Sequence, residues 1–398
     1  MKTFVITDRS RTESKTEKFL DSSVAVKSHS GLHSTECNLI ENLPSLTTCK
    51  SLLIAGNRTG AAAMIASTLH PECAITCHAQ DIHHASIIYR NLNNNSLPVS
   101  FLCDDYVKLA NGYFETEPQQ FTVACTTQIP DRQFNNALFM VTPSTVTGEQ
   151  CLDMLENIHK VLKVGGKCII AYEGESHTFN KNLKSVFGQV HTVQQNRKGS
   201  IFIATKKTEL KKPRNFAATF ETSLPDTGKI ELISLPGVFC HRRADNGGLA
   251  LAEVAALLLE SKMRVLDMGC GCGIVGILLS QKQPDIELSF IDSSARALDA
   301  TNRNIKSHSM PSTELILSDN GTKEIGYDLF AGNPPYYSDY RIAECFIEQA
   351  YNSLKVGGTA LIVTKQSTKV GDLIYEKFDN AEITPRRGYS VITAVKEG

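Results

Sequence analysis

One order of strands and helices occurs twice along this chain of 398 residues. Short apolar runs that stop at glycine or proline indicate buried strands, and longer apolar segments between them indicate helices. In the first half we expect strands at 51–55, 73–77, 99–103, 137–141 and 168–172, and helices at 60–69 and 85–93. In the second half we expect strands at 264–268, 287–291, 314–317, 327–331 and 359–364, and helices at 274–280, 294–307 and 343–354. Strands that alternate with helices are typical of a doubly wound parallel sheet.

A repeated segment links the two halves. The residues His159-Lys-Val-Leu-Lys-Val-Gly-Gly166 match Tyr351-Asn-Ser-Leu-Lys-Val-Gly-Gly358. In each copy we expect a helix that ends at the glycine pair, because glycine commonly terminates helices, and a strand directly after it. The predicted fold class is therefore α/β, with two tandem Rossmann-like domains that arose by duplication. The expected domain bounds are 1–205 and 231–398, with a basic linker at 206–230.

The composition limits the class of partner. Lys and Arg total 41 against 42 Asp and Glu, and the net charge of −1 excludes a protein that holds nucleic acid by bulk positive charge alone. A local basic face is still allowed, and the run Lys206–Arg214 fits either a solvated linker or a segment that contacts phosphate. No run approaches the ~20 apolar residues of a membrane helix, and we expect no secretory signal at the start. Twelve cysteines without disulfide spacing agree with the cytoplasmic, membrane-free protein that we expect.

A glycine-rich turn follows the predicted strand at 264–268. Its glycines Gly269, Gly271 and Gly273 let the backbone turn sharply and approach a ligand, and the next helix offers free N–H groups. Together with Gly276 they also fit the G-x-G-x-x-G pattern of dinucleotide-binding proteins. Alone, this turn does not separate a nicotinamide cofactor from S-adenosylmethionine.

Asp267 and the motif further along the chain favour S-adenosylmethionine, and two other acidic residues are candidates to bind it. A carboxylate at Asp267, just before the glycines, suits the methionine ammonium group and would repel a pyrophosphate. Asp292 lies where a ribose-binding acid is expected, and Asp319 lies where methyltransferases often hold the adenine amino group. We therefore expect S-adenosylmethionine as the cofactor.

The motif Asn333-Pro334-Pro335-Tyr336 follows the strand at 327–331, at the edge where open α/β sheets bind ligands. The two prolines stiffen the backbone, so that the Asn333 side-chain oxygen and a proline carbonyl face one point. Two acceptors suit an –NH2 group, whose lone pair is then directed out of plane toward a methyl donor. Tyr336 can stack on a planar substrate. These residues predict an enzyme that methylates an amino group, with all four as catalytic residues.

No metal site is expected. Cys270 and Cys272 lack further ligands at a workable spacing. A denser group matches no standard zinc finger: Cys73, Cys77, His78, His83 and His84.

The C-terminal half resembles a known family. The segments Leu235-Pro-Gly-Val-Phe239, Asp245-Asn-Gly247 and Val265-Leu-Asp-Met-Gly-Cys-Gly271, with the Asn-Pro-Pro-Tyr motif, are similar to bacterial ribosomal RNA guanine-N2 methyltransferases, above all the small-subunit methyltransferase C enzymes. The resemblance implies two tandem domains, of which only the second binds S-adenosylmethionine. It implies the N2 amine of a guanine in small-subunit (16S) ribosomal RNA as substrate, and ribosomal RNA or a ribosomal subunit as partner.

The first half departs from the cofactor pattern. Ile54 stands in place of Asp267, and the position that matches Asp292 falls near His78-Ala79, also without an acid. Met140-Val-Thr-Pro143 replaces the Asn-Pro-Pro-Tyr motif. The resemblance therefore implies a degenerate copy that serves fold stability and RNA docking.

Three other functions are left open. The family usually has Phe where this chain has Tyr336, and protein glutamine N5-methyltransferases carry Asn-Pro-Pro-Tyr. Those enzymes usually have a small helical N-terminal domain, whereas this N-terminal half is predicted to be α/β. A large-subunit ribosomal RNA guanine-N2 methyltransferase is the second alternative. A non-catalytic RNA-binding or ribosome-assembly factor is the third, and the intact Asp267 and Asn333 argue against it.

Overall fold

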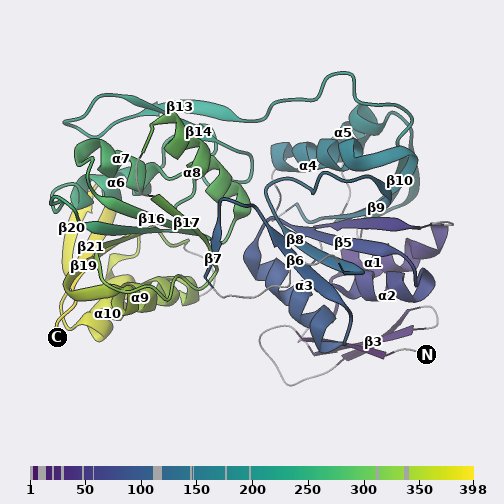
Figure 1. The fold of residues 1–398 in the computed structure, drawn as a ribbon, viewed down its shortest axis with the longest axis horizontal. Coiled ribbons are helices and arrows are strands. Elements are labelled where there is room, and N and C mark those ends of the chain that lie inside the picture. The colour runs from purple at the N-terminus through teal and green to yellow at the C-terminus, as the bar shows by residue number, and fades with distance from the viewer. Residues whose placement is uncertain are drawn as a thin grey trace. The chain divides into compact units, whose positions relative to one another are not determined.

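The chain divides into two compact units in the computed structural model (Figure 1). Unit 1 contains residues 1–104 and 113–216, and unit 2 contains residues 105–112 and 217–398. The structure describes residues 3–7, 15–19, 22–27, 31–46, 49–56, 58–110, 119–143, 146, 148–174, 177–196, 199–310, 313–335 and 340–398.

Unit 1 has the alternating strands and helices of an α/β domain. Its strands are β1 Thr3–Thr7, β2 Lys15–Phe19, β3 Ser22–Lys27, β4 Ser51–Ala55, β5 Ala74–Ala79, β6 Val99–Cys103, β8 Phe121–Cys125, β9 Phe134–Val141, β10 Leu162–Tyr172, β11 Val190–Asn196 and β12 Gly199–Thr205. Its helices are α1 Ser34–Asn42, the 3₁₀ helix Leu43–Ser45, α2 Ala61–Leu69, α3 Ile82–Asn94, α4 Gly148–Val161 and α5 His177–Phe187. The large sheet has the order β11-β12-β10-β9-β4-β5-β8-β6, and a small sheet has the order β1-β3-β2.

Unit 2 repeats this architecture. Its strands are β7 Lys108–Leu109, β13 Ala218–Thr222, β14 Ile230–Ser234, β15 Arg264–Met268, β16 Glu287–Asp292, β17 Thr313–Leu317, β18 Tyr327–Gly332, β19 Leu354–Thr364, β20 Glu382–Arg386 and β21 Tyr389–Val395. Its helices are α6 Asn246–Ala255, α7 Ile274–Lys282, α8 Ala295–Ser307, α9 Arg341–Ser353 and α10 Ser367–Phe378. The large sheet has the order β20-β21-β19-β18-β15-β16-β17-β7, and β13 pairs with β14.

The two large sheets have the same layered arrangement. In each, a parallel core is extended at one edge by an antiparallel hairpin, β11–β12 or β20–β21. Helices α1, α2 and α3 cover one face of the first sheet and α4 and α5 the other (Figure 1). In the second sheet α6, α7 and α8 cover one face and α9 and α10 the other. Two tandem Rossmann-like domains are therefore present, and the predicted fold class is confirmed. Within the described residues, no helix has both the length and the apolar character needed to cross a lipid bilayer.

The predicted repeat has the same backbone hydrogen bonds in both units. Gly165 N–H donates to Lys206 O at 2.8 Å, and Gly357 N–H donates to Lys396 O, also at 2.8 Å. The two copies therefore share a detailed geometry as well as an order of elements, which supports their origin by duplication.

The glycine pairs lie inside strands, so the expectation that helices end at them is wrong. α4 and α9 end before the pair, and β10 and β19 run through it. A Cβ on Gly358 would lie 2.9 Å from Tyr327 O, and a Cβ on Gly166 would lie 2.7 Å from Asn135 O. Glycine is needed here because the backbone of the neighbouring strand passes too close for a side chain.

The basic run at 206–214 is anchored to unit 1 at both ends. The Lys206 side chain is fully buried, and its Nζ donates to Lys160 O at 3.3 Å. Arg214 pairs with the buried carboxylate of Glu156. The lysines between these anchors are exposed: Lys207, Lys211 and Lys212.

Unit 2 has one strand that comes from the first half of the sequence. β7 pairs in parallel with β17, with Lys108 opposite Ile316. Lys108 Nζ lies 2.8 Å from Glu314 Oε1 and also contacts Glu324. These contacts, Glu314 first, raise the pKa of Lys108. β7 therefore covers the edge of the strand that leads to Asp319, and the sequence pattern gave no sign of it.

We expect Lys108→Glu to lower the thermal unfolding midpoint of unit 2, because two attractive contacts become repulsion among three carboxylates. Exposed ion pairs contribute up to about 1 kcal/mol each, so the loss is modest. It should shrink in 1 M NaCl, where charges are screened beyond about 3 Å. Calorimetry at low and high salt measures this, with Lys108→Gln as a control of intermediate effect. Equal midpoints for the wild type and Lys108→Glu at low salt would mean that these ion pairs add no stability.

Candidate active site

The described residues predicted to bind a ligand lie at the carboxyl edge of the unit 2 sheet. Asp267 is the fourth residue of β15, and Asp292 ends β16. Asp319 comes just after β17, and Asn333 directly follows β18. Because β15 to β18 are parallel neighbours, all four positions meet at one edge, where open α/β sheets bind ligands.

The glycine turn between β15 and α7 is tight and tied to the next strand. Gly269, Gly271 and Gly273 have φ of 71°, 60° and 80°, a region that other residues rarely adopt. Gly271 N–H donates to Asp292 Oδ2 at 3.0 Å, so the turn and the end of β16 are held together. A Cβ on Gly271 would meet only Val238, at 3.9 Å, which leaves open space at the centre of the turn.

The Asp267 carboxyl group lies at the start of α7. Its side chain is buried, and its Oδ2 accepts the Gly276 N–H at 3.0 Å. Burial raises the pKa of Asp267 to about 7; the Gly276 hydrogen bond lowers it, and the nearby Asp292 carboxylate raises it further. A helix N-terminus that already faces this carboxyl group is poorly suited to a pyrophosphate. The acidic side chains at this edge accept hydrogen bonds, and they agree better with an ammonium group and the hydroxyls of a nucleoside.

The Asn333 side chain is oriented by a residue of another element. Asn333 Nδ2 donates to Asp245 Oδ2 at 2.8 Å, and the same oxygen accepts Gly248 N–H at 2.8 Å as the N-cap of α6. An ionised carboxylate only accepts hydrogen bonds, so the amide nitrogen must face Asp245. The Asn333 Oδ1 has no hydrogen-bond partner in the described part of the chain. This oxygen is available as an acceptor.

The remaining motif residues differ in what the structure describes. Pro334 is buried and Pro335 is half-buried, so the segment after Asn333 is held against the domain. Tyr336, predicted to stack on the substrate, lies outside the described residues.

Sequence reasoning assigned no role to two residues at this site. Asp245 was noted only as part of a resembling segment, although an acid before a helix is a recognisable N-cap signal. Tyr389 begins β21, and its ring lies near the Asn333 amide. No local pattern marks Tyr389, because its place depends on how a distant hairpin returns to the sheet.

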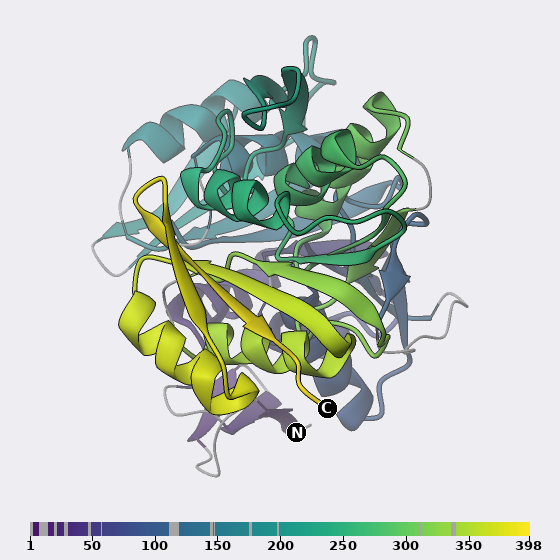
Figure 2. The ribbon, with the colours of Figure 1, turned by 90° about the vertical axis from the view of Figure 1, so that its left-hand side faces the viewer.

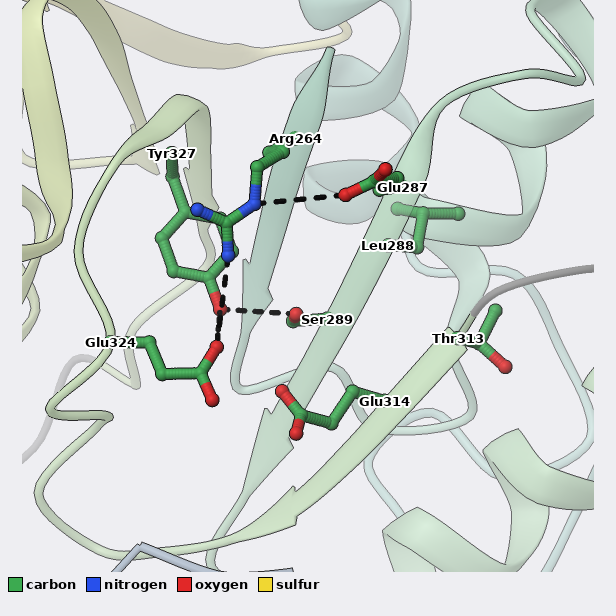
Figure 3. Close-up of a pocket in the computed structure, with 8 residues that line it drawn as sticks. All are labelled: Arg264, Glu287, Leu288, Ser289, Thr313, Glu314, Glu324 and Tyr327. Carbon is green, nitrogen blue, oxygen red and sulfur yellow. Dashed lines mark hydrogen bonds and ion pairs between the residues drawn. The ribbon is translucent and has the colours of Figure 1, made fainter. Parts of the chain in front are cut away.

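A pocket of about 390 Å³ lies at the opposite, amino edge of the same sheet (Figure 3). Its lining comes largely from the first residues of β15 to β18, and Arg264 lies over the Tyr327 ring, 4.7 Å from its centroid. Tyr327 donates to Ser289 Oγ at 3.0 Å. Arg264 pairs with Glu287 and Glu324, and none of the predicted site residues lines the pocket.

Unit 1 has a different arrangement at the equivalent edge. Ile54 is the fourth residue of β4, as Asp267 is of β15, and strand pairing places Met140 level with Asn333. Glu36 of α1 is fully buried, and both its carboxylate oxygens lie 2.8 Å from Thr59 Oγ1 at the start of α2. Burial raises the pKa of Glu36 to about 7, opposed by the Thr59 hydrogen bond. A carboxyl group of the chain itself thus fills the start of this helix.

Among the described residues, no group of three potential metal ligands is found at either edge.

The fold, the glycine turn and the oriented amide together define a Rossmann-like methyltransferase. The methyltransferase small domain family matches residues 229–393, which span the whole candidate site.

Curated relatives identify the family. The chain is 30% identical over 246 residues to the ribosomal RNA small subunit methyltransferase C of Pseudoalteromonas translucida. The aligned region covers 58% of this chain and 69% of that protein. The enzyme of the same name from Psychromonas ingrahamii is 28% identical over 252 residues, covering 59% and 69%. The chain belongs to the ribosomal RNA small subunit methyltransferase C family, and the resemblance seen in its motifs is confirmed.

A solved relative shares the complete fold. The 16S rRNA N2 G1207 methyltransferase of T. thermophilus, in complex with AdoMet and guanosine, superposes with a TM-score of 0.72 at 15% identity. The match covers 97% of this chain and 98% of that one. Both tandem domains are therefore common to the two proteins.

We expect the affinity for S-adenosylhomocysteine to rise about tenfold between pH 6 and pH 8. In the ligand-free chain Asp267 has a pKa of about 7, and an ammonium partner favours its ionised form, so binding at low pH must first remove a proton. Calorimetric titration at each pH measures the affinity. The amino group of S-adenosylhomocysteine stays protonated between pH 6 and pH 8, so the change in affinity reports the protonation of Asp267. Asp267→Asn should bind more weakly, with a flat profile. A flat wild-type profile would contradict the role of Asp267.

Proposed function

We propose that this chain transfers a methyl group from S-adenosylmethionine to the N2 amine of a guanine in small-subunit ribosomal RNA. The observation that carries the proposal is the Asn333 amide, whose nitrogen is held by Asp245 and whose oxygen points to no described partner. Family membership supplies the class of substrate. The guanosine bound to the T. thermophilus relative agrees with it.

Each cofactor residue is proposed to hold one part of S-adenosylmethionine. Asp267 and the turn of Gly269, Gly271 and Gly273 hold the methionine end, and the open space at Gly271 supports this. Asp292 accepts from the ribose hydroxyls and Asp319 from the adenine amine. The acids stand at the ends of neighbouring strands, and adjoining parts of a nucleoside can reach successive strand ends.

The proposed catalysis is one of positioning. Asn333 Oδ1 and the Pro334 carbonyl accept the two hydrogens of the target amine, which directs its lone pair out of the ring plane. S-adenosylmethionine supplies a sulfonium methyl group; the amine nitrogen bonds to its carbon, the C–S electron pair goes to sulfur, and one N–H proton leaves to solvent. Orientation and hydrogen bonding provide the acceleration, so no general base is assigned. The guanine must leave its stack to reach the edge.

Unit 1 is proposed to bind no S-adenosylmethionine. The Glu36 carboxyl group already fills the start of α2, and Ile54 and Met140 replace the polar residues of unit 2. We infer that the N-terminal half instead serves fold stability and docking to ribosomal RNA. The substrate is proposed to be the RNA alone or within a ribosomal subunit, in the cytoplasm.

Methyl transfer from radiolabelled S-adenosylmethionine tests the proposal. The acceptors are deproteinised ribosomal RNA, both ribosomal subunits and total protein from a strain without this chain, followed by nucleoside analysis. We expect label only as N2-methylguanosine in small-subunit RNA. Label in large-subunit RNA would mean that the substrate is large-subunit ribosomal RNA. Label in glutamine of a protein would mean that the chain is a protein glutamine N5-methyltransferase. S-adenosylmethionine binding without any labelled acceptor would favour a non-catalytic assembly factor.

Asn333→Ala is expected to lower kcat by a factor of about 100 to 1000, the usual loss for one preorganised transition-state hydrogen bond. The Kd for S-adenosylhomocysteine should stay within about threefold, because Asn333 faces the amine and not the cofactor. Asn352→Ala, at an exposed position on α9, is the control and should keep full activity. If Asn333→Ala instead abolished cofactor binding and left turnover per bound cofactor unchanged, the proposed role would be wrong.

A further inference from the structure

A hairpin of unit 2 ends beside the candidate active site. Strands β20 and β21 pair Arg386 with Tyr389, so Arg387 and Gly388 form a two-residue turn. Both turn residues have positive φ, 51° and 76°, as the hairpin turns that match strand twist require. The residue after Tyr389 pairs with the last residue of β19. The turn and Tyr389 therefore lie at the same carboxyl edge as Asn333 (Figure 2, hairpin in yellow).

An ion-pair cluster fixes this hairpin to α6. The side chain of Glu253 is only 4% exposed, and its carboxylate contacts Arg386 Nε and, at 2.6 Å, Arg387 Nη2. Burial raises the pKa of Glu253, but the two arginines, Arg387 first, bring it below its ordinary value. Because α6 also carries Asp245 at its N-cap, the hairpin turn and the Asn333 amide are both held by one helix.

The Tyr389 ring and the Asn333 amide both approach Gly247 at the start of α6. A Cβ atom built on Gly247 would lie 3.2 Å from Tyr389 Cε1, 3.4 Å from Asn333 Nδ2 and 3.0 Å from Asp245 Oδ2, so the three atoms surround one point. Tyr389 is half-buried, and its hydroxyl has no hydrogen-bond partner in the parts of the chain that the structure describes. A buried tyrosine usually gives its hydroxyl a partner within the fold, whereas the half-buried Tyr389 keeps its hydroxyl open to solvent or a ligand. This ring therefore has surface and polar capacity left for a ligand.

Lys365 adds a positive charge at the ring. Its Nζ lies 4.8 Å from the Tyr389 centroid, and the residue is exposed just after β19. Because Lys365 lies over one face of the ring, a base would stack on the opposite face. The ammonium group at the ring then supplies a partner for the phosphate of one unpaired nucleotide.

We propose that Tyr389 is a further stacking surface for the target guanine, in addition to the stacking predicted for Tyr336, with Lys365 at the adjoining phosphate and the Glu253 ion pairs holding the hairpin in place. The inference rests on the proposed function and names a substrate-binding residue for it. Tyr389 would form a wall beside the acceptor pair of Asn333 and Pro334, so that the stacked base presents its N2 amine to them.

Tryptophan fluorescence tests the contact without any methyl transfer. The chain contains no tryptophan, so Tyr389→Trp introduces a single reporter. With S-adenosylhomocysteine present, guanosine should quench it in a saturable manner. Tyr375→Trp, on α10 where Tyr375 is 58% exposed, is the matched control and should not respond. Unchanged fluorescence of the Tyr389→Trp variant at millimolar guanosine would overturn the proposal, whether or not the chain proves to methylate guanine.

Steady-state kinetics separates a substrate contact from a structural role. Tyr389→Leu should raise the KM for RNA at least tenfold, in the range known for loss of one base–aromatic stack, and leave the Kd for S-adenosylhomocysteine unchanged. Tyr389→Phe should restore the wild-type KM, because the ring and not the hydroxyl is required. A wild-type KM in Tyr389→Leu would overturn the stacking role and leave the methyltransferase activity of the wild type standing. A wild type that methylates no guanine would instead overturn the proposed function.

Discussion

The hydrogen bond from Asn333 to Asp245 joins the parts of the candidate site. Asn333 follows β18, and Asp245 caps α6, so a single contact of 2.8 Å connects the motif to the helix above the sheet. Glu253 on the same helix binds the hairpin that carries Tyr389. The contact also decides which end of the amide faces outward, since the carboxylate accepts only N–H groups. Without it, the amide could rotate and offer a donor where an acceptor is needed.

The two units place a carboxyl group at the start of the helix after their first core strand in different ways. In unit 2 the carboxyl group of Asp267 comes from the strand beneath α7 and bonds inside the domain, which leaves the glycine turn open. In unit 1 the carboxyl group of Glu36 comes from α1 and reaches the start of α2 from outside the sheet. Both groups satisfy a helix N-terminus. The two carboxyl groups differ in the element that supplies them, β15 in unit 2 and α1 in unit 1.

Much of the fold could be predicted from the sequence, because buried parallel strands are short apolar runs with clear ends. The strands at 51–55, 99–103 and 264–268 have the predicted bounds. Some strands were missed. The buried β8, between β5 and β6, was not predicted, and the edge strand β20 is mostly exposed and carries few apolar residues to form a pattern. β7 was missed because two residues give no periodicity and pair with a strand more than two hundred positions away.

The candidate site divides in the same way. Asp267, Asp292 and Asn333 could be found because each follows or ends a recognisable strand, so their meeting at one edge follows from parallel topology. The orientation of the Asn333 side chain could not be predicted from the sequence, because it depends on Asp245, 88 positions earlier in the chain. Their individual roles toward the cofactor and the amine are still predictions.

The rate of methyl transfer by Asp245→Ser tests the central claim most directly. Serine retains the N-cap of α6 but is too short to hold the Asn333 amide. We expect a kcat at least tenfold below wild type, with the unfolding midpoint and the Kd for S-adenosylhomocysteine nearly unchanged. Asp245→Asn, which keeps an acceptor oxygen, should recover the wild-type kcat. A wild-type kcat in Asp245→Ser would contradict the claim that this contact orients the catalytic amide.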